Sequence, residues 1–201
     1  MINLIVVSII SAQLNPTTIS AAKTARMLEK KGDLNGAIAV YESILTNNPD
    51  HAQSVQSLKN IFLDHQKYEK GIEFFKTRLS QNPHDFRNYS ELGEFYYLNG
   101  QLKDANNIWY SGINKFKHSR SFYRIMISVF GKYGLDENIS KTLDRGKNTF
   151  GKSFLSYEAG IYYQAHQVYD KAMEQYILHL IHEPNRNGII ERRILQMSDE
   201  D

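Results

Sequence analysis

The feature that most constrains this chain is a pairing of small and aromatic residues that returns every 34 residues. The small residues are Ala37, Gly71 and Ala105, and the rings four residues after them are Tyr41, Phe75 and Trp109. Pro49 and Pro83 keep the same interval. Such an interval is typical of a stack of short structural units, because one unit cannot bury its apolar face without a neighbour.

Apolar spacing inside one interval predicts two helices. In residues 89–98 the apolar side chains stand three and four positions apart, which places them on one helical face. Asn99-Gly100-Gln101 interrupts this pattern, and residues 102–116 resume it. Pro49 and Pro83 then follow second helices, where proline ends one helix and suits the first turn of the next.

The repeat predicts five helical hairpins over residues 18–186. We expect these units at 18–51, 52–85, 86–119, 120–152 and 153–186, with the fourth unit one residue short. The fourth unit also has Ile139 where the other units have a small residue. Residues 187–201 are expected to form a capping helix or the start of a further repeat.

Side-chain size explains why small and aromatic residues recur at fixed positions. Gly93 and Ala105 are expected to let the two helices of one hairpin approach closely, because almost no side chain separates them. The rings expected to fill the gaps between successive hairpins are Tyr96, Trp109, Tyr163 and Tyr176. A stack of three or more such hairpins buries a continuous core.

The third unit resembles the tetratricopeptide repeat, a 34-residue helix-turn-helix unit with a Trp, Leu-Gly, Tyr, Ala, Phe, Pro pattern. The matching residues are Tyr89 in place of Trp, Leu92-Gly93, Tyr96, Ala105, and Trp109 in place of Phe. Departures from the pattern are Lys117 in place of Pro here, and Lys59, Ile127 and Ile139 in place of small residues elsewhere. The resemblance implies an all-α fold, a right-handed α-solenoid of about five antiparallel hairpins plus a C-terminal helix.

In the tetratricopeptide family the first helix of each hairpin lines the concave surface, and ligands lie along it. The resemblance therefore implies a non-catalytic scaffold or adaptor that binds a protein or peptide of unknown identity. Carried over by position, the residues expected on this surface are Arg26, Lys30, Gln53, Gln56, Asn60, Arg87, Glu94, Tyr97, Arg124, Lys132, Tyr157 and Gln164. Arg, Tyr and amide side chains suit such a surface because they provide hydrogen bonds and ring contacts.

Composition removes several other classes of function. The chain has no cysteine, which excludes disulfides, thiolate metal sites and a cysteine nucleophile. A formal net charge of +2 gives no electrostatic case for binding nucleic acid. The sequence has no Gly-rich phosphate loop, nucleophile elbow or paired-carboxylate motif, so we expect no enzyme activity, no cofactor and no metal.

Two features have an alternative interpretation. His179 and His182 are three residues apart and precede Glu183, so both histidines could face one metal ion. We favour surface or seam packing, because the metalloprotease helix places its histidines four apart around a glutamate. The stretch from Gln101 to Lys152 is locally basic, and we interpret its charges as solvated outer faces instead of a patch for an acidic partner.

Residues 1–12 are apolar and uncharged, which favours a secretory signal cut between Ala12 and Gln13. The segment is too short to cross a bilayer as a helix, which needs about 20 apolar residues. It is atypical because no Lys or Arg precedes Lys23. This predicts export to the bacterial envelope, as a periplasmic or secreted protein, and a cytoplasmic protein if the segment is instead a buried first helix.

A second class of function is also compatible with the repeat. The chain would then be a structural N-terminal or truncated segment of a longer solenoid, with no ligand of its own. The apolar pattern from Gly188 to Leu195 begins a helix after Pro184 and then stops, which indicates either a capping helix or half of an interrupted sixth hairpin.

Substitutions at Ala105 and Arg87 test the expected helical faces. Ala105→Trp should overpack the hairpin and lower the free energy of unfolding by about 1–3 kcal/mol or more. Arg87→Ala should leave this free energy nearly unchanged if Arg87 faces the groove. Urea unfolding of both variants measures the difference, and the reverse order would contradict the placement of the faces.

Overall fold

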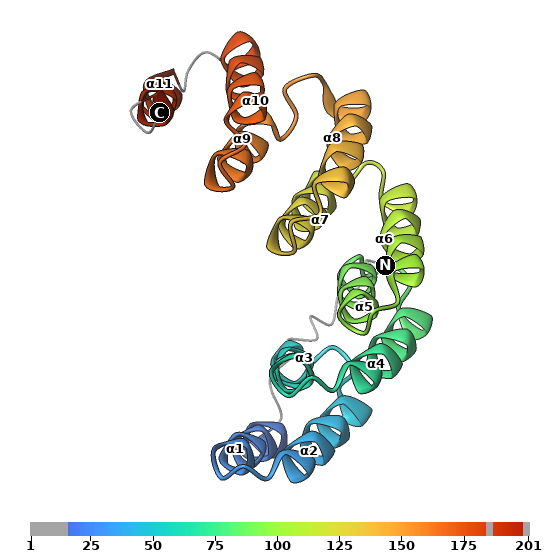
Figure 1. The fold of residues 1–201 in the computed structure, drawn as a ribbon. Coiled ribbons are helices and arrows are strands. Elements are labelled where there is room, and N and C mark those ends of the chain that lie inside the picture. Colours follow the sequence, from blue (N-terminus) through green and yellow to red (C-terminus); the bar gives the residue numbers. More distant parts are fainter. Residues whose placement is uncertain (1–15, 184–186, 199–201) are drawn as a thin grey trace, which may run out of the picture. The chain divides into compact units, whose positions relative to one another are not determined.

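The computed structural model describes residues 16–183 and 187–198, which form eleven α-helices and contain no strand (Figure 1). The helices are α1 (Pro16–Lys30), α2 (Leu34–Asn47), α3 (Ala52–Asp64), α4 (Tyr68–Gln81), α5 (Arg87–Leu98), α6 (Leu102–Lys115), α7 (Arg120–Lys132), α8 (Asp136–Phe150), α9 (Ser156–Ala165), α10 (Tyr169–His182) and α11 (Asn187–Ser198). None of these helices is both long and apolar enough to cross a membrane. The predicted signal segment, residues 1–12, and Pro184 lie outside the described residues.

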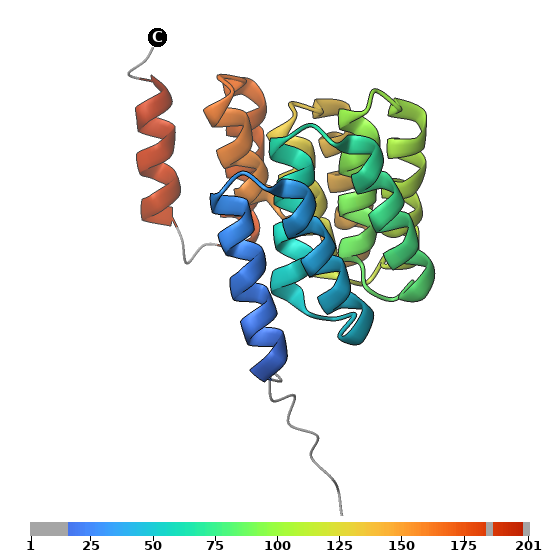
Figure 2. The same cartoon turned by 90° about the horizontal axis from the view of Figure 1, so that it is seen from below.

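The chain divides into two compact units, residues 1–71 and 72–201, with the boundary inside α4. In the first unit α1 packs against α2, and α2 packs against α3. In the second unit the helices pair as α5 with α6, α7 with α8 and α9 with α10 (Figure 1). Helix α7 also contacts both helices of the preceding pair, and α11 lies beside α10 (Figure 2). These pairs confirm the all-α fold of consecutive helical hairpins.

A residue with left-handed backbone geometry joins the two helices of each hairpin. These residues are Gly32, Gln66, Gly100, Gly134 and Gln167, with φ angles of 81°, 51°, 76°, 64° and 58°. At Gly100 the turn lets the Gln101 N–H donate to the Tyr96 carbonyl at 2.9 Å, which closes the end of α5. The interval between these turns is 34 residues three times and then 33 residues.

Close approach of α5 and α6 depends on Gly93. A methyl group on its Cα would overlap the indole ring of Trp109, which is only 1% exposed. The Trp109 Nε1–H donates to the Ser90 carbonyl at 3.2 Å, so the buried indole also satisfies its one donor. Gly160 stands in the same way against the Tyr176 ring in α9–α10.

This arrangement corrects the expected role of two rings. Trp109 and Tyr176 pack first onto the glycine of their own hairpin, where no side chain keeps the ring away, instead of lying only between hairpins. Trp109 then reaches the next hairpin through an edge contact with Phe130, at 5.0 Å between ring centroids. The same ring thus closes one hairpin and joins it to the next.

Further rings form the seams between neighbouring hairpins of the second unit. Phe75 and Phe95 stack at 5.5 Å between centroids, which joins α4 to α5. Gly112 of α6 makes room for Phe122 of α7, because a methyl group there would lie 2.8 Å from the Phe122 ring. Aromatic pairs of this kind add to the stabilisation that burial of their area provides.

The resemblance to the tetratricopeptide repeat is thus present in packing as well as in sequence. Ala105 is fully buried between the paired helices, where the family has its small residue. Ile127 and Ile139, which replace small residues in the fourth unit, are 6% and 0% exposed. This unit therefore packs with larger side chains at the same positions.

Gly93→Ala tests the closure of α5 on α6. The added methyl should displace Trp109 and lower the free energy of unfolding of the second unit by about 1–3 kcal/mol or more. The matched control is Gly188→Ala in α11, where an added methyl meets no atom within 4 Å. The control should be neutral or raise stability by up to about 1 kcal/mol through helix propensity. Denaturant unfolding measures both, and equal effects would contradict the proposed closure.

Candidate functional site

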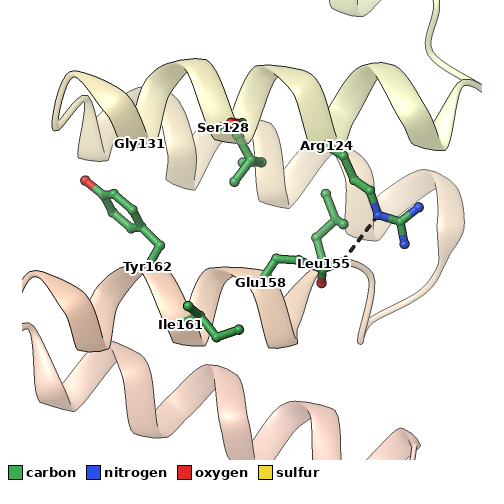
Figure 3. A pocket seen from close by; sticks show the side chains of 8 residues that line it. Arg124, Ser128, Gly131, Leu155, Glu158, Ile161 and Tyr162 are labelled. Carbon is green, nitrogen blue, oxygen red and sulfur yellow. Dashed lines mark hydrogen bonds and ion pairs between the residues drawn. The ribbon is translucent and has the colours of Figure 1, made fainter.

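A pocket of about 320 Å³ lies between α7 and α9, the first helices of two successive hairpins (Figure 3). Its lining residues are Arg124, Ile127, Ser128, Gly131, Leu155, Glu158, Ile161 and Tyr162. Ile127, Leu155 and Ile161 give this lining its apolar character. Figure 3 shows the side chains of Leu155 and Tyr162 in the space between the two helices.

Polar contacts lie at both ends of this pocket. At one end the Arg124 Nε donates to a Glu158 carboxylate oxygen at 3.3 Å, in an ion pair whose side chains are 56% and 42% exposed. At the other end the Tyr162 hydroxyl donates to Asp136 at 2.9 Å. Burial, and then this bond to a carboxylate, raise the pKa of Tyr162, so the phenol stays protonated at physiological pH.

The backbone conformation of the turn between α8 and α9 positions Leu155 in the lining of the pocket, where it forms the apolar floor. Leu155 is 4% exposed and has a left-handed backbone with φ 57°, which is strained for a residue with a branched side chain. Gly151, with φ 109°, precedes it in the turn that leads from α8 to α9. Gly131 lets the Tyr162 ring approach α7, because a methyl group there would lie 3.1 Å from the ring.

A second pocket, of about 270 Å³, adjoins the first and shares Arg124, Leu155 and Glu158 with it. Its other lining residues are Arg120, Phe150, Ser153, Phe154, Tyr157, His179 and Glu183. The Arg120 guanidinium lies 4.8 Å and 5.2 Å from the ring centroids of Phe150 and Phe154. This pocket is therefore polar where the first one is apolar.

The two histidines considered as metal ligands have different surroundings. His179 is 8% exposed and faces Ser156 and Tyr157. His182 is exposed, and its ring nitrogen contacts the Leu178 carbonyl at 3.0 Å. Among residues 16–183 and 187–198, no group of three or more metal-binding side chains could hold an ion.

Two residues predicted on the concave surface, Glu94 of α5 and Lys132 of α7, contact each other. Glu94 is 3% exposed, and its carboxylate accepts hydrogen bonds from Lys132 Nζ at 2.8 Å and from the Tyr133 hydroxyl at 2.6 Å. Tyr97 lies against the Tyr133 ring, at 4.9 Å between centroids. Glu94 is therefore an internal link between hairpins, whereas Lys132 keeps 56% of its side chain exposed.

The other predicted residues of the second unit lie in different surroundings. Arg124 lines both pockets, and Tyr157 lines the polar one. Gln164 accepts a hydrogen bond from the Tyr176 hydroxyl at 2.7 Å and also contacts Arg193 of α11. Arg87 is exposed at the start of α5.

The predicted residues of the first unit are all exposed. They are Arg26 and Lys30 in α1, and Gln53, Gln56 and Asn60 in α3. Gln56 and Asn60 hydrogen bond to each other at 2.9 Å. The pockets described above draw none of their lining from this unit.

Most residues that line the two pockets are not among those predicted on the concave surface. Ile161 and Ser128 lie on expected first helices, so their helical phase is a signal that could have found them. Leu155 and His179 enter through the turn between α8 and α9 and through a second helix, and the repeat pattern does not specify their orientation.

The sequence identity to known proteins is low. No family model matches the chain. The general transcriptional corepressor ssn6 of Schizosaccharomyces pombe is 25% identical over 116 residues, which cover 56% of this chain and only 10% of the corepressor.

Among solved structures, the MamA protein superposes with a TM-score of 0.48 at 18% identity, covering 86% of this chain and 94% of MamA. TTC0263, a tetratricopeptide repeat protein of Thermus thermophilus, gives 0.49 at 16% identity, covering 90% and 98%. YrrB, described as a tetratricopeptide repeat protein with an unusual peptide-binding site, gives 0.43 at 16%, covering 90% and 92%.

The buried link at Glu94 can be tested through its two donors. Tyr133→Phe keeps the ring but removes a hydrogen bond to a buried carboxylate, and should lower the free energy of unfolding by about 1.5–3 kcal/mol. Lys132→Ala should lower it by a smaller amount, because 56% of the Lys132 side chain is exposed and solvent partly screens its ion pair with Glu94. Thermal or urea unfolding of both variants gives the order, and a larger effect at Lys132 would contradict this account.

Proposed function

We propose that the chain is a non-catalytic scaffold that holds a segment of another protein against the first-helix face of α7 and α9. The apolar pocket between these helices is the observation that supports the proposal. Its volume of about 320 Å³ is at the lower end of the range of ligand pockets, about 300–1,000 Å³, and suits a single large side chain.

The rim of the pocket supports a polypeptide ligand. Arg124 and Glu158 are both partly exposed, so their remaining donors and acceptors can reach a peptide backbone at the same time as an apolar side chain enters. The resemblance to the tetratricopeptide repeat independently assigns ligands to first helices. The pocket and the family expectation thus favour the same surface.

Export to the bacterial envelope is a separate part of the proposal. It rests on the apolar, uncharged character of residues 1–12. Cell fractionation with an antibody against the chain tests this part, with N-terminal sequencing of the recovered protein. A mature chain that begins at Gln13 in the envelope fraction supports it, whereas an uncut chain in the cytosol contradicts it.

A structural segment of a longer solenoid is the second candidate. Ile189 and Leu195 of α11 are 54% and 63% exposed, which favours coverage of this helix by further helical units. On that account the α7–α9 pocket has no ligand of its own. The experiment below separates the two candidates.

A photoreactive side chain tests the binding surface. Ser128 is exposed on α7 and lines the pocket, so p-benzoylphenylalanine at this position should crosslink a partner in living cells. The same substitution at Asp144, exposed on α8, is the matched control and should give no such product. Mass spectrometry identifies the crosslinked protein.

A second substitution shows whether the pocket itself is used. Ile161→Glu should reduce the crosslink at Ser128 by about tenfold or more, because a carboxylate would then occupy the apolar pocket. Ile177→Glu is its control, since Ile177 of α10 is 47% exposed and is not part of the pocket lining. Equal crosslinking at Ser128 and Asp144, or no effect of Ile161→Glu, would refute this binding surface.

A further inference from the structure

The exposed face of α1 combines large apolar side chains with lysines. Ile19 and Met27 are 53% and 48% exposed, and Lys23 and Lys30 are exposed as well. These four residues follow one another at intervals of four, four and three positions, so they lie on one side of the helix. Ala25, on the opposite side, is fully buried where α1 packs against α2. The helix therefore presents a mixed apolar and basic face to solvent.

The carboxylates nearest to this face are bound to groups of α2. Glu29 is the one acidic residue from Pro16 to Gly32, and it accepts a hydrogen bond from the hydroxyl of the fully buried Tyr41. The next carboxylate, Asp33, accepts from the Gly36 N–H at 2.9 Å. The exposed basic residues of the same segment are Lys23, Arg26, Lys30 and Lys31. The exposed face of α1 is therefore positively charged.

Another exposed apolar stripe, on α10, has the opposite charge. Ile177 and Ile181 are 47% and 69% exposed, and the exposed acids Asp170 and Glu174 precede them on the same helical face. Carboxylates at this position would repel an anionic surface, whereas the lysines of α1 would attract it. Charge thus distinguishes two faces that expose apolar side chains to a similar extent.

A helical face with this composition suits the surface of an anionic membrane. Lysine side chains place their ammonium groups at the level of the lipid phosphates, while their alkyl chains cover apolar surface. Apolar side chains such as Ile19 and Met27 then enter the boundary between headgroups and acyl chains. An acidic protein would satisfy the lysines but would also need an apolar groove for these two side chains.

We propose that the face of α1 formed by Ile19, Lys23, Met27 and Lys30 docks the protein on an anionic lipid surface. The helix lies parallel to that surface, with its axis in the headgroup region. None of the residues that line the two pockets belongs to α1, so this inference goes beyond the proposed function and does not depend on it. A scaffold with both surfaces would hold its partner beside a membrane.

Co-sedimentation of the purified full chain with lipid vesicles tests the docking. Vesicles of phosphatidylcholine and phosphatidylglycerol in equal parts should bind the chain about tenfold or more tightly than vesicles of phosphatidylcholine alone. Residues 1–12 have no charged side chain, so they do not account for such a preference. Added salt should weaken the binding, because it screens the lysines from the lipid phosphates.

Charge reversal assigns this preference to α1. Lys23→Glu combined with Lys30→Glu should reduce binding to the level of phosphatidylcholine vesicles, because two attractive charges become repulsive. Lys103→Glu combined with Lys117→Glu is the matched control, since both lysines are exposed and belong to the locally basic stretch of the second unit. The control should keep the preference for anionic vesicles. Circular dichroism of both variants checks that the helices are retained.

Ile19→Trp reports whether the apolar side chains enter the lipid. The emission of this tryptophan should shift to shorter wavelength on the anionic vesicles, because the ring leaves water for the interface. Leu102→Trp, at a position that is 55% exposed in α6, is the matched control and should show no shift. Trp109 is 1% exposed and adds the same background to both spectra.

Three results would overturn the proposal. The first is equal binding to the two kinds of vesicle, and the second is an equal loss of binding in the two charge-reversal variants. The third is an unchanged emission of Ile19→Trp on anionic vesicles. If the chain then binds soluble polyglutamate as tightly as the vesicles, the face belongs to an acidic protein. Because these assays contain only purified protein and a defined probe, their outcome is independent of crosslinking at Ser128.

Discussion

Two of the helix pairs, α5–α6 and α9–α10, depend on one steric condition, the near absence of a side chain where a large ring crosses its partner helix. At Gly93 the Trp109 ring lies directly over the backbone of α5, and its N–H reaches the Ser90 carbonyl one turn earlier. Gly160 and Tyr176 repeat this arrangement in α9 and α10. Dense packing of this kind tolerates little added volume, which explains why the small residues recur at a fixed interval.

Two seams between first helices show how the same architecture provides either a closed or an open surface. Between α5 and α7 the buried carboxylate of Glu94 is bound by Lys132 and Tyr133, so polar contacts fill the seam. Between α7 and α9 the ion pair of Arg124 and Glu158 lies at the exposed rim, and the apolar floor beneath it stays uncovered. The difference in burial of the two charge pairs thus distinguishes a structural contact from the surface that we propose for binding.

The fold could be predicted from the sequence because side-chain size at positions such as Gly93, Ala105 and Trp109 is periodic. The site could be predicted only in part. Arg124 was found by its place on a first helix, but Glu94 has the same helical phase and is buried, since only the tertiary contact with α7 decides its exposure. Leu155 depends on a left-handed backbone that its residue type does not indicate.

Trp109 also determines what a simple optical measurement can report. It is the single tryptophan of the chain, it is 1% exposed, and it contacts α5, α6 and α7 at once. Its intrinsic fluorescence therefore reports the opening of that junction to solvent. The emission spectrum would not register local unfolding of α1 to α3, so circular dichroism is needed beside it to follow the first unit.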